Sequence, residues 1–188
     1  YKNAITYSKK KKIKFGIALS DVEKIDFLEE IGIDFYKILS QDINNKILIK
    51  SILNTKKPTY ISTGLSNFTE ISELIRFIKP NLENVTLIHT TLRPDIKYVN
   101  LNAIIKLSEK FHLPVAFGNH CKNPSVLFTA LAYQPSDIFF YVKGSKFKNH
   151  QDEVHAINLQ DLYWYVKNLK ELKFSLGTSI KMKLTPPP

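Results

Sequence analysis

The sequence has little cysteine and no long apolar run. Its single cysteine, Cys121, excludes an internal disulfide framework and fits a reducing compartment. No apolar stretch approaches the roughly 18 residues that a membrane-spanning helix needs. Residues 1–15 are basic and lack the apolar core of a secretory signal peptide. We therefore expect a cytoplasmic protein without a membrane segment.

Acidic residues are outnumbered by basic ones. Asp and Glu number 17 against 27 Lys and Arg, which gives a formal net charge of +10. A basic surface favours an anionic partner but does not separate nucleic acid, phosphorylated metabolites and membrane surfaces. The lysines are scattered among Ile and Asn, and the known nucleic-acid-binding signatures are missing from the sequence. We expect no nucleic-acid partner, and a nucleic-acid-binding protein stays an alternative that rests on charge alone.

Short β-rich runs alternate with amphipathic helical stretches along the chain. The predicted strands are 13–18, 34–39, 58–62, 85–90, 114–117 and 137–142. Apolar residues at helical spacing follow these strands, and the strands are apolar on both faces, as in parallel sheets. The pattern predicts a parallel α/β sheet, either open and doubly wound or part of a (β/α)8 barrel.

Local signals predict several boundaries. Ser20 with Glu23 predicts a capping box, as does Asn67 with Glu70, and Gly32 is expected to end the first of these helices. We divide the chain into a basic N-terminal segment (1–12), a barrel domain (13–175) and an exit segment (176–188). The three prolines that close the exit segment cannot continue a helix.

Polar residues gather where the predicted strands end, which is where parallel α/β folds place functional side chains. They are Lys37 and Ser40, Ser62 and Thr63, His89 and Thr90, Asn119 and His120, and Lys143 and Lys146. These residues also have ordinary structural interpretations that involve no ligand. Lys37 either binds an anion in a barrel mouth or snorkels at the edge of the sheet. The segment 62–64 either binds an anion or only caps a helix. Either His89 and His120 share a metal or, as spacing favours, one of them donates to a backbone carbonyl.

Taken in order, five segments resemble the sialic acid synthase family. They are DFYKILS (34–40), YISTGLSN (60–67), VTLIHTT (85–91), LPVAFGNH (113–120) and VHAINL (154–159). The resemblance implies a (β/α)8 barrel, incomplete here, with about six βα units and without a counterpart of the first two strands. It also implies a transferase that condenses phosphoenolpyruvate with an N-acetylated aldose, giving a nonulosonic acid for surface polysaccharide biosynthesis.

The resemblance further implies a divalent metal, manganese or magnesium, that polarises the sugar aldehyde, and it is compatible with a homodimer. Carried over by position, four residues would face phosphoenolpyruvate: Lys37, Ser40, Ser62 and Thr63. Asn119 would contact substrate, and His120 would be a metal ligand. His155 would act catalytically from the loop that closes over the site.

Several positions depart from the family pattern. Ile17 and Ala18 replace hydroxyl residues, Gly118-Asn119 replaces Ser-Asp, and Phe140-Tyr141-Val142 replaces Glu-Lys-His, which includes the second metal histidine. A catalytically inactive sugar- or sugar-phosphate-binding pseudo-enzyme or partner subunit is therefore the alternative to the enzyme. Because six strands cannot close an eight-stranded barrel, the sequence leaves open a fragment, a truncated relative or a barrel that a partner completes.

Overall fold

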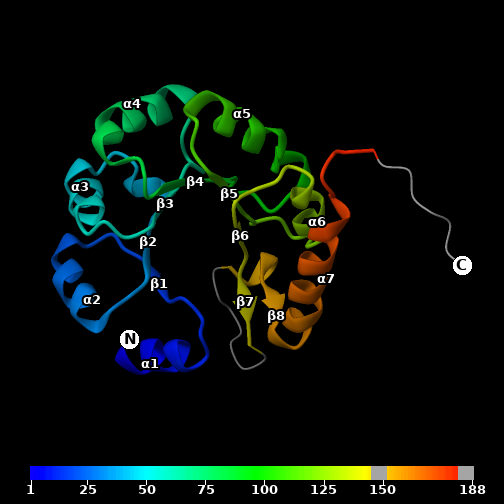
Figure 1. Cartoon of the computed structure of the whole chain (residues 1–188), viewed down its shortest axis with the longest axis horizontal. Helices are drawn as coiled ribbons and strands as arrows, with labels where there is room; N and C mark the ends of the chain where they lie inside the picture. The colour runs from blue at the N-terminus through cyan, green and yellow to red at the C-terminus, as the bar shows by residue number, and fades with distance from the viewer. Residues whose placement is uncertain (145–151, 182–188) are drawn as a thin grey trace, which may run out of the picture.

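The computed structural model describes residues 1–144 and 152–181. Six strands pair in chain order into one parallel sheet: β1 (Gly16–Ala18), β2 (Phe35–Ile38), β3 (Thr59–Ser62), β4 (Val85–Thr90), β5 (Val115–Gly118) and β6 (Ile138–Phe139). Figure 1 shows the sheet curled into an arc, with helices around its outside. The helices are α1 (Lys2–Lys10), α2 (Ile25–Ile31), α3 (Lys46–Asn54), α4 (Phe68–Ile78), α5 (Asn102–Phe111), α6 (Val126–Leu131) and α7 (Leu162–Ser175).

Short 3₁₀ helices complete the connections. They are η1 (Val22–Lys24), η2 (Ser40–Asp42), η3 (Lys79–Asn81), η4 (Ile96–Tyr98), η5 (Glu153–His155) and η6 (Leu159–Asp161). The strand order never reverses, which excludes the doubly wound alternative because that fold changes direction at a switch point. β1 and β6 are the two edges of the sheet, so the predicted incomplete (β/α)8-type barrel is confirmed.

The outer face of the sheet packs against the helices. Leu48, Ile49 and Ile52 recur at helical spacing on α3 and are buried, as are the matching apolar positions of α4 and α5. Each such side chain stabilises the fold by roughly 1.5–3 kcal/mol relative to an exposed one. Within the described residues, no helix is both long enough and apolar enough to cross a membrane.

The inner face of the arc carries an aromatic layer below the ends of the strands. Phe35 of β2 makes an edge contact with Tyr60 of β3, and Tyr60 makes another with Phe139 of β6 across the arc. Side chains alternate along a strand, so Lys37 points to the same side as Phe35. Gly16 pairs with Phe35, and a Cβ there would lie 2.2 Å from its ring, so glycine makes room for this layer.

The predicted strand 137–142 is wrong as one element. Only Ile138 and Phe139 join the main sheet, and the chain leaves it after Phe139. A separate two-stranded sheet follows, in which β7 (Val142–Lys143) pairs in parallel with β8 (Ile157–Asn158). An unbroken apolar run does not reveal where a strand stops pairing, because both sheets accept the same residue types.

With one exception, the helix boundaries that the sequence predicted from capping residues are confirmed. Asn67 and Glu70 form the predicted capping box, and Gly32 ends α2 with a left-handed φ of 75°. The capping box at Ser20 is wrong. Asp21 accepts from the backbone N–H of Glu23 instead, and the Ser20 hydroxyl donates to Asp42 at 2.6 Å. The neighbouring carboxylate is the stronger cap because it carries a full negative charge.

Candidate functional site

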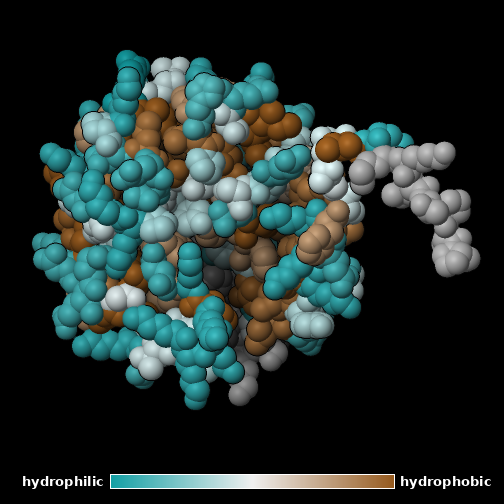
Figure 2. Space-filling model, viewed as in Figure 1, coloured by the Kyte–Doolittle hydropathy of each residue, from teal (hydrophilic) through white to brown (hydrophobic). Residues whose placement is uncertain are grey.

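A cavity of about 540 Å³ opens at the carboxyl ends of the strands. Its polar lining includes Lys37, Ser40, Ser62, His120, Tyr141, Asp152 and His155. The space-filling view down the same axis as Figure 1 shows the centre of the molecule hollowed (Figure 2). The location is the one at which parallel barrel folds hold their ligands.

Five of the seven predicted site residues meet in this cavity, namely Lys37, Ser40, Ser62, His120 and His155. The other two, Thr63 and Asn119, form hydrogen bonds with backbone groups. The Thr63 hydroxyl donates to the Ile88 carbonyl, and the Asn119 amide bonds to the backbone N–H and carbonyl of Cys121. Contacts of Thr63 and Asn119 with substrate therefore stay predictions.

Lys37 reaches the cavity from β2, the strand next to the β1 edge of the sheet. Its Nζ lies 5.6 Å from the centre of the Phe139 ring, a cation–π contact on the aromatic layer. Burial lowers the pKa of Lys37, and the negative charge of Asp152 opposes that shift. Of the two interpretations of Lys37, the structure supports the barrel mouth, since the side chain lines the cavity.

Ser40 and Ser62 bring two hydroxyls to the same wall. Ser40 begins η2 two residues after the end of β2, and Ser62 is the last residue of β3. Both residues are buried while lining the cavity. Two hydroxyls beside one lysine form a set of donors suited to a phosphate or carboxylate.

His120 follows β5, and both of its ring nitrogens have contacts. Nδ1 lies 2.8 Å from the Thr90 hydroxyl, and Nε2 lies 3.2 Å from the Tyr141 hydroxyl. Burial, together with the positive charges of His155 and Lys37, lowers the pKa of His120 to about 4. The imidazole is therefore neutral near pH 7, the state in which it can bind a metal.

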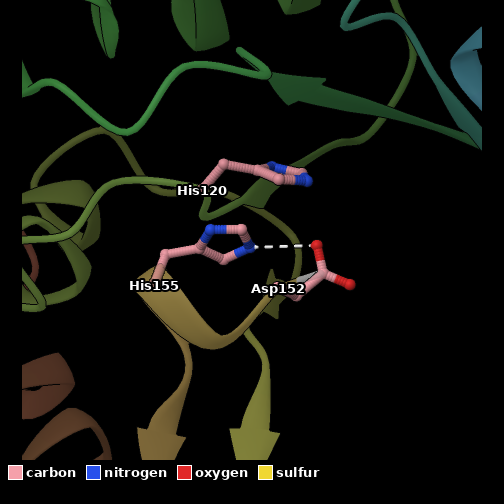
Figure 3. Close-up of side chains that lie close together, drawn as sticks. All are labelled: His120, Asp152 and His155. Carbon is pink, nitrogen blue, oxygen red and sulfur yellow. Dashed lines mark ion pairs between the residues drawn. The ribbon is translucent and has the colours of Figure 1, made fainter. Parts of the chain in front are cut away.

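His155 and Asp152 approach His120 from the segment that contains η5. His155 Nε2 lies 3.3 Å from Asp152 Oδ1, and the rings of His120 and His155 are 4.9 Å apart between centroids. Figure 3 shows the two rings one above the other, with the carboxylate beside them. Burial lowers the pKa of His155 as well, against an opposing effect of Asp152.

The cluster fits a divalent cation. His120, Asp152 and His155 each offer one ligand atom, and these atoms lie within 4.8 Å of one another. In the described part of the chain, His155 Nε2 is the buried side-chain atom without a well-aligned hydrogen bond, despite its closeness to Asp152. Such a nitrogen suits a metal, since two imidazoles and a carboxylate are common ligands of transition metals.

His89 takes no part in this cluster. Its Nε2 lies 2.9 Å from the Val99 carbonyl. This backbone contact is the role that the spacing of the histidines favoured over metal binding. Asp152 and Tyr141 are two polar residues of the cavity that sequence reasoning missed. Asp152 stands three residues before His155, and this spacing indicates that the two residues share one turn. The place of Tyr141 in the cavity could not be predicted, because it depends on where β6 stops pairing.

Comparison with known proteins gives a consistent result. The sequence pattern described as the NeuB family matches residues 1–181. The chain is 28% identical to an N,N'-diacetyllegionaminic acid synthase of Campylobacter jejuni over 96% of its own length and 56% of the relative. It is 27% identical to the enzyme of that name from Legionella pneumophila, over 90% and 49% respectively. The chain thus spans about half the length of the curated relatives it matches.

Solved structures share the fold. The crystal structure of an N-acetylneuraminic acid synthetase from Leptospira borgpetersenii in complex with citrate matches with a TM-score of 0.88 and 24% identity. That match covers 99% of this chain and 65% of the other. A truncated 3-deoxy-D-arabino-heptulosonate 7-phosphate synthase from Thermotoga maritima matches with a TM-score of 0.77 and 16% identity, over 96% of this chain and 75% of that one.

Proposed function

Because the chain belongs to the NeuB family, we propose that it condenses phosphoenolpyruvate with an N-acetylated aldose to give a nonulosonic acid. One observation carries the proposal. Three residues suited to an anion (Lys37, Ser40 and Ser62, the anion-binding set) and three suited to a metal (His120, Asp152 and His155, the metal-binding set) line the same cavity at the ends of the strands. A reaction between a phosphorylated acid and an aldehyde needs both sets in one place.

The anion-binding set would hold phosphoenolpyruvate. The Lys37 ammonium would pair with the phosphate or carboxylate, and the hydroxyls of Ser40 and Ser62 would donate to its oxygens. The aromatic layer beneath Lys37 keeps water away from one side of the ammonium, which strengthens its attraction for an anion.

The metal-binding set would face the sugar. A bound divalent metal, manganese or magnesium, supplies a Lewis acid that polarises the aldehyde oxygen. His120 would hold it through Nε2, and Thr90 would fix the ring by contacting Nδ1. The Asp152 carboxylate would lower the net positive charge that the metal brings to the cavity.

The reaction balances without a redox partner. The methylene carbon of phosphoenolpyruvate forms a bond to the aldehyde carbon, and the aldehyde oxygen gains a proton. Water adds at the former enol carbon, and inorganic phosphate leaves. The chain's contribution is to bring the two carbons into contact and to hold the charged groups in fixed positions.

The names of the relatives support a synthase over the binding-only alternative. The natural full-length polypeptide should release phosphate from phosphoenolpyruvate only when manganese and a suitable N-acetylated aldose are both present. Lys37→Met should strongly reduce release at low phosphoenolpyruvate concentration, and Lys50→Met, which alters an exposed lysine of α3, should not. The absence of phosphate release with every one of a broad set of N-acetylated aldoses would contradict the proposal.

A further inference from the structure

We propose that the basic turn at the end of α1, residues 9–14, docks on the surface of a membrane that contains anionic phospholipids. The inference is independent of the proposed reaction, because this surface lies away from the cavity. All six residues of the turn are exposed. Five of them are lysines and the sixth is an isoleucine, namely Lys9, Lys10, Lys11, Lys12, Ile13 and Lys14.

The lysines of the basic turn have no carboxylate to neutralise them in the described part of the chain. Within residues 1–144 and 152–181, none of the five forms an ion pair. Five ammonium groups along six residues repel one another, and an external anionic surface would relieve that repulsion. Each lysine near an anionic membrane contributes about 1 kcal/mol, which is about fivefold in affinity.

The basic turn has a defined backbone conformation. The Ile13 N–H donates to the Ser8 carbonyl at 2.9 Å, and the Lys12 N–H donates to the Lys9 carbonyl at 3.0 Å. These two bonds form a Schellman motif, in which glycine usually takes the left-handed position. Lys12 takes that position here, with a φ of 55°. A lysine in this conformation is strained relative to glycine, so the fold carries the charge at residue 12 at a cost in stability.

The helix end accounts for only part of this charge. Lys9 and Lys10 lie in the last turn of α1, where positive side chains offset the partial negative charge of the helix end. Lys11, Lys12 and Lys14 follow the last helical residue, and the effect of the helix end falls off beyond that turn. The later lysines therefore need another explanation.

Two exposed apolar side chains lie among the lysines. Ile13 is 62% exposed, and Tyr7 is 64% exposed. Lys11 Nζ lies 5.8 Å from the centre of the Tyr7 ring, which places this ring next to the basic turn. An aromatic and an aliphatic side chain beside several lysines are typical of surfaces that lie against lipid headgroups.

The basic turn and the cavity lie at opposite ends of the sheet. The turn leads into β1, which begins at Gly16, so it lies at the amino end of the strands, whereas the cavity opens at their carboxyl ends. Helix α1 lies at the end of the arc beside β1 and is held there by the buried side chain of Ile5 (Figure 1). A membrane can therefore bind the turn without covering the cavity.

A membrane fits this surface better than a nucleic acid does. The basic turn has no arginine, whereas nucleic-acid surfaces commonly use arginine because its guanidinium group forms two parallel hydrogen bonds with a phosphate. Lysine acts as a hydrated point charge that needs no fixed partner geometry, which suits lipid headgroups that move in the plane of the bilayer. Nucleic-acid binding is therefore the competing outcome of the test.

Co-sedimentation of the natural full-length polypeptide with lipid vesicles tests the inference. The protein should bind vesicles of phosphatidylcholine mixed with phosphatidylglycerol and should not bind phosphatidylcholine alone. Raising the ionic strength from about 0.1 M to about 1 M shortens the Debye length from about 10 Å to about 3 Å and should release the protein. A DNA duplex at an equal phosphate concentration should leave the protein on the vesicles, and transfer of the protein to the duplex would overturn the inference.

Two double variants locate the binding surface. Lys11→Gln with Lys12→Gln should weaken vesicle binding about 25-fold, at about fivefold for each lysine. Glutamine has nearly the helix propensity of lysine, so α1 should still form. Lys50→Gln with Lys170→Gln removes the same charge from exposed positions on α3 and α7 and should leave binding nearly unchanged. Equal losses in the two double variants would mean that only net charge matters, which would overturn the inference.

Two single substitutions separate binding from folding. Lys12→Gly should raise the melting temperature, because glycine adopts the left-handed conformation without strain, and should still weaken vesicle binding about fivefold. Ile13→Ser leaves the charge unchanged and should also weaken vesicle binding, since an exposed apolar contact is lost. Wild-type vesicle affinity in both variants would place the binding surface elsewhere and overturn the inference.

Discussion

The Thr90 hydroxyl lies 2.8 Å from Nδ1 of His120, and this contact joins the carboxyl ends of β4 and β5. Thr90 pairs with Gly118 in the sheet, and a Cβ at Gly118 would lie 3.2 Å from the Thr90 Cβ and 3.0 Å from an Ile88 methyl. Because Gly118 has no side chain, the Thr90 side chain has space beside it. Thr90 in turn orients His120.

Gly118→Ala tests that relationship. Ile88 is buried and Thr90 is held by its contact with His120, so neither side chain can move freely. Overpacking of this kind costs typically about 1–3 kcal/mol. Urea denaturation of the metal-free protein should show a loss of that size, and Mn²⁺ affinity should fall as His120 loses its orientation. A change in stability within about 0.5 kcal/mol, with unchanged metal affinity, would show that the two strands adjust freely.

Much of the fold could be predicted from the sequence. Periodicity indicated the parallel sheet and its helices, and the side chains of Asn67 and Glu70 marked the start of α4. The split of 137–142 could not be predicted. Its apolar residues fit both sheets, and the choice between them depends on pairing with Gly118 in one sheet and Ile157 in the other.

Part of the candidate site could also be predicted from the sequence, because the ends of the strands determine which residues meet. Residues that end strands meet in barrel folds, so Lys37, Ser40, Ser62 and His120 come together as expected. Thr63 and Asn119 end strands too, but short polar side chains also bond to nearby backbone, and spacing does not distinguish the two outcomes.

Lys37→Met should weaken the binding of phosphoenolpyruvate about 10- to 100-fold, because a charge-assisted hydrogen bond contributes about 1.5–3 kcal/mol. Methionine keeps the length of the side chain and its contact with the aromatic layer, so the fold should be unaffected. Calorimetric titration of the natural polypeptide measures the change, with Lys50→Met as the matched control. Equal loss in both variants would indicate only a general effect of net charge.

Tyr141→Phe should not weaken metal binding. Because the Tyr141 hydroxyl contacts the His120 nitrogen that we assign to the metal, its removal should raise Mn²⁺ affinity by about 2- to 10-fold, the equivalent of a net hydrogen bond of about 0.5–1.5 kcal/mol. Isothermal titration measures this shift. A loss of affinity would mean that the phenol oxygen is itself a ligand.

Acid should destabilise the metal-free protein through its histidines. The pKa of His120 is lowered to about 4 by burial and by the charges of His155 and Lys37. Between about pH 6.5 and pH 4 the unfolded chain therefore binds a proton at this residue that the folded chain does not, and the free energy of unfolding falls as pH falls through that range. The pKa values of His89 and His155 are lowered by burial, so their effects have the same sign.

His120→Gln removes one of these three contributions. Urea denaturation at pH 7 and pH 4.5, with a chelator present throughout, should show a smaller loss of stability in the variant than in the wild type. His112→Gln should lose as much as the wild type does. An identical loss in His120→Gln would mean that His120 is already solvated in the folded protein.

The central claim is that a carbon–carbon bond forms in the cavity between Lys37 and His120. Carbon-13 spectroscopy with phosphoenolpyruvate labelled at its methylene carbon observes that bond directly. With manganese and a suitable N-acetylated aldose, the natural polypeptide should convert the label into the saturated methylene of a nonulosonic acid, one for each phosphate released. A label that stays in phosphoenolpyruvate, or that appears only in pyruvate, would contradict the proposed condensation.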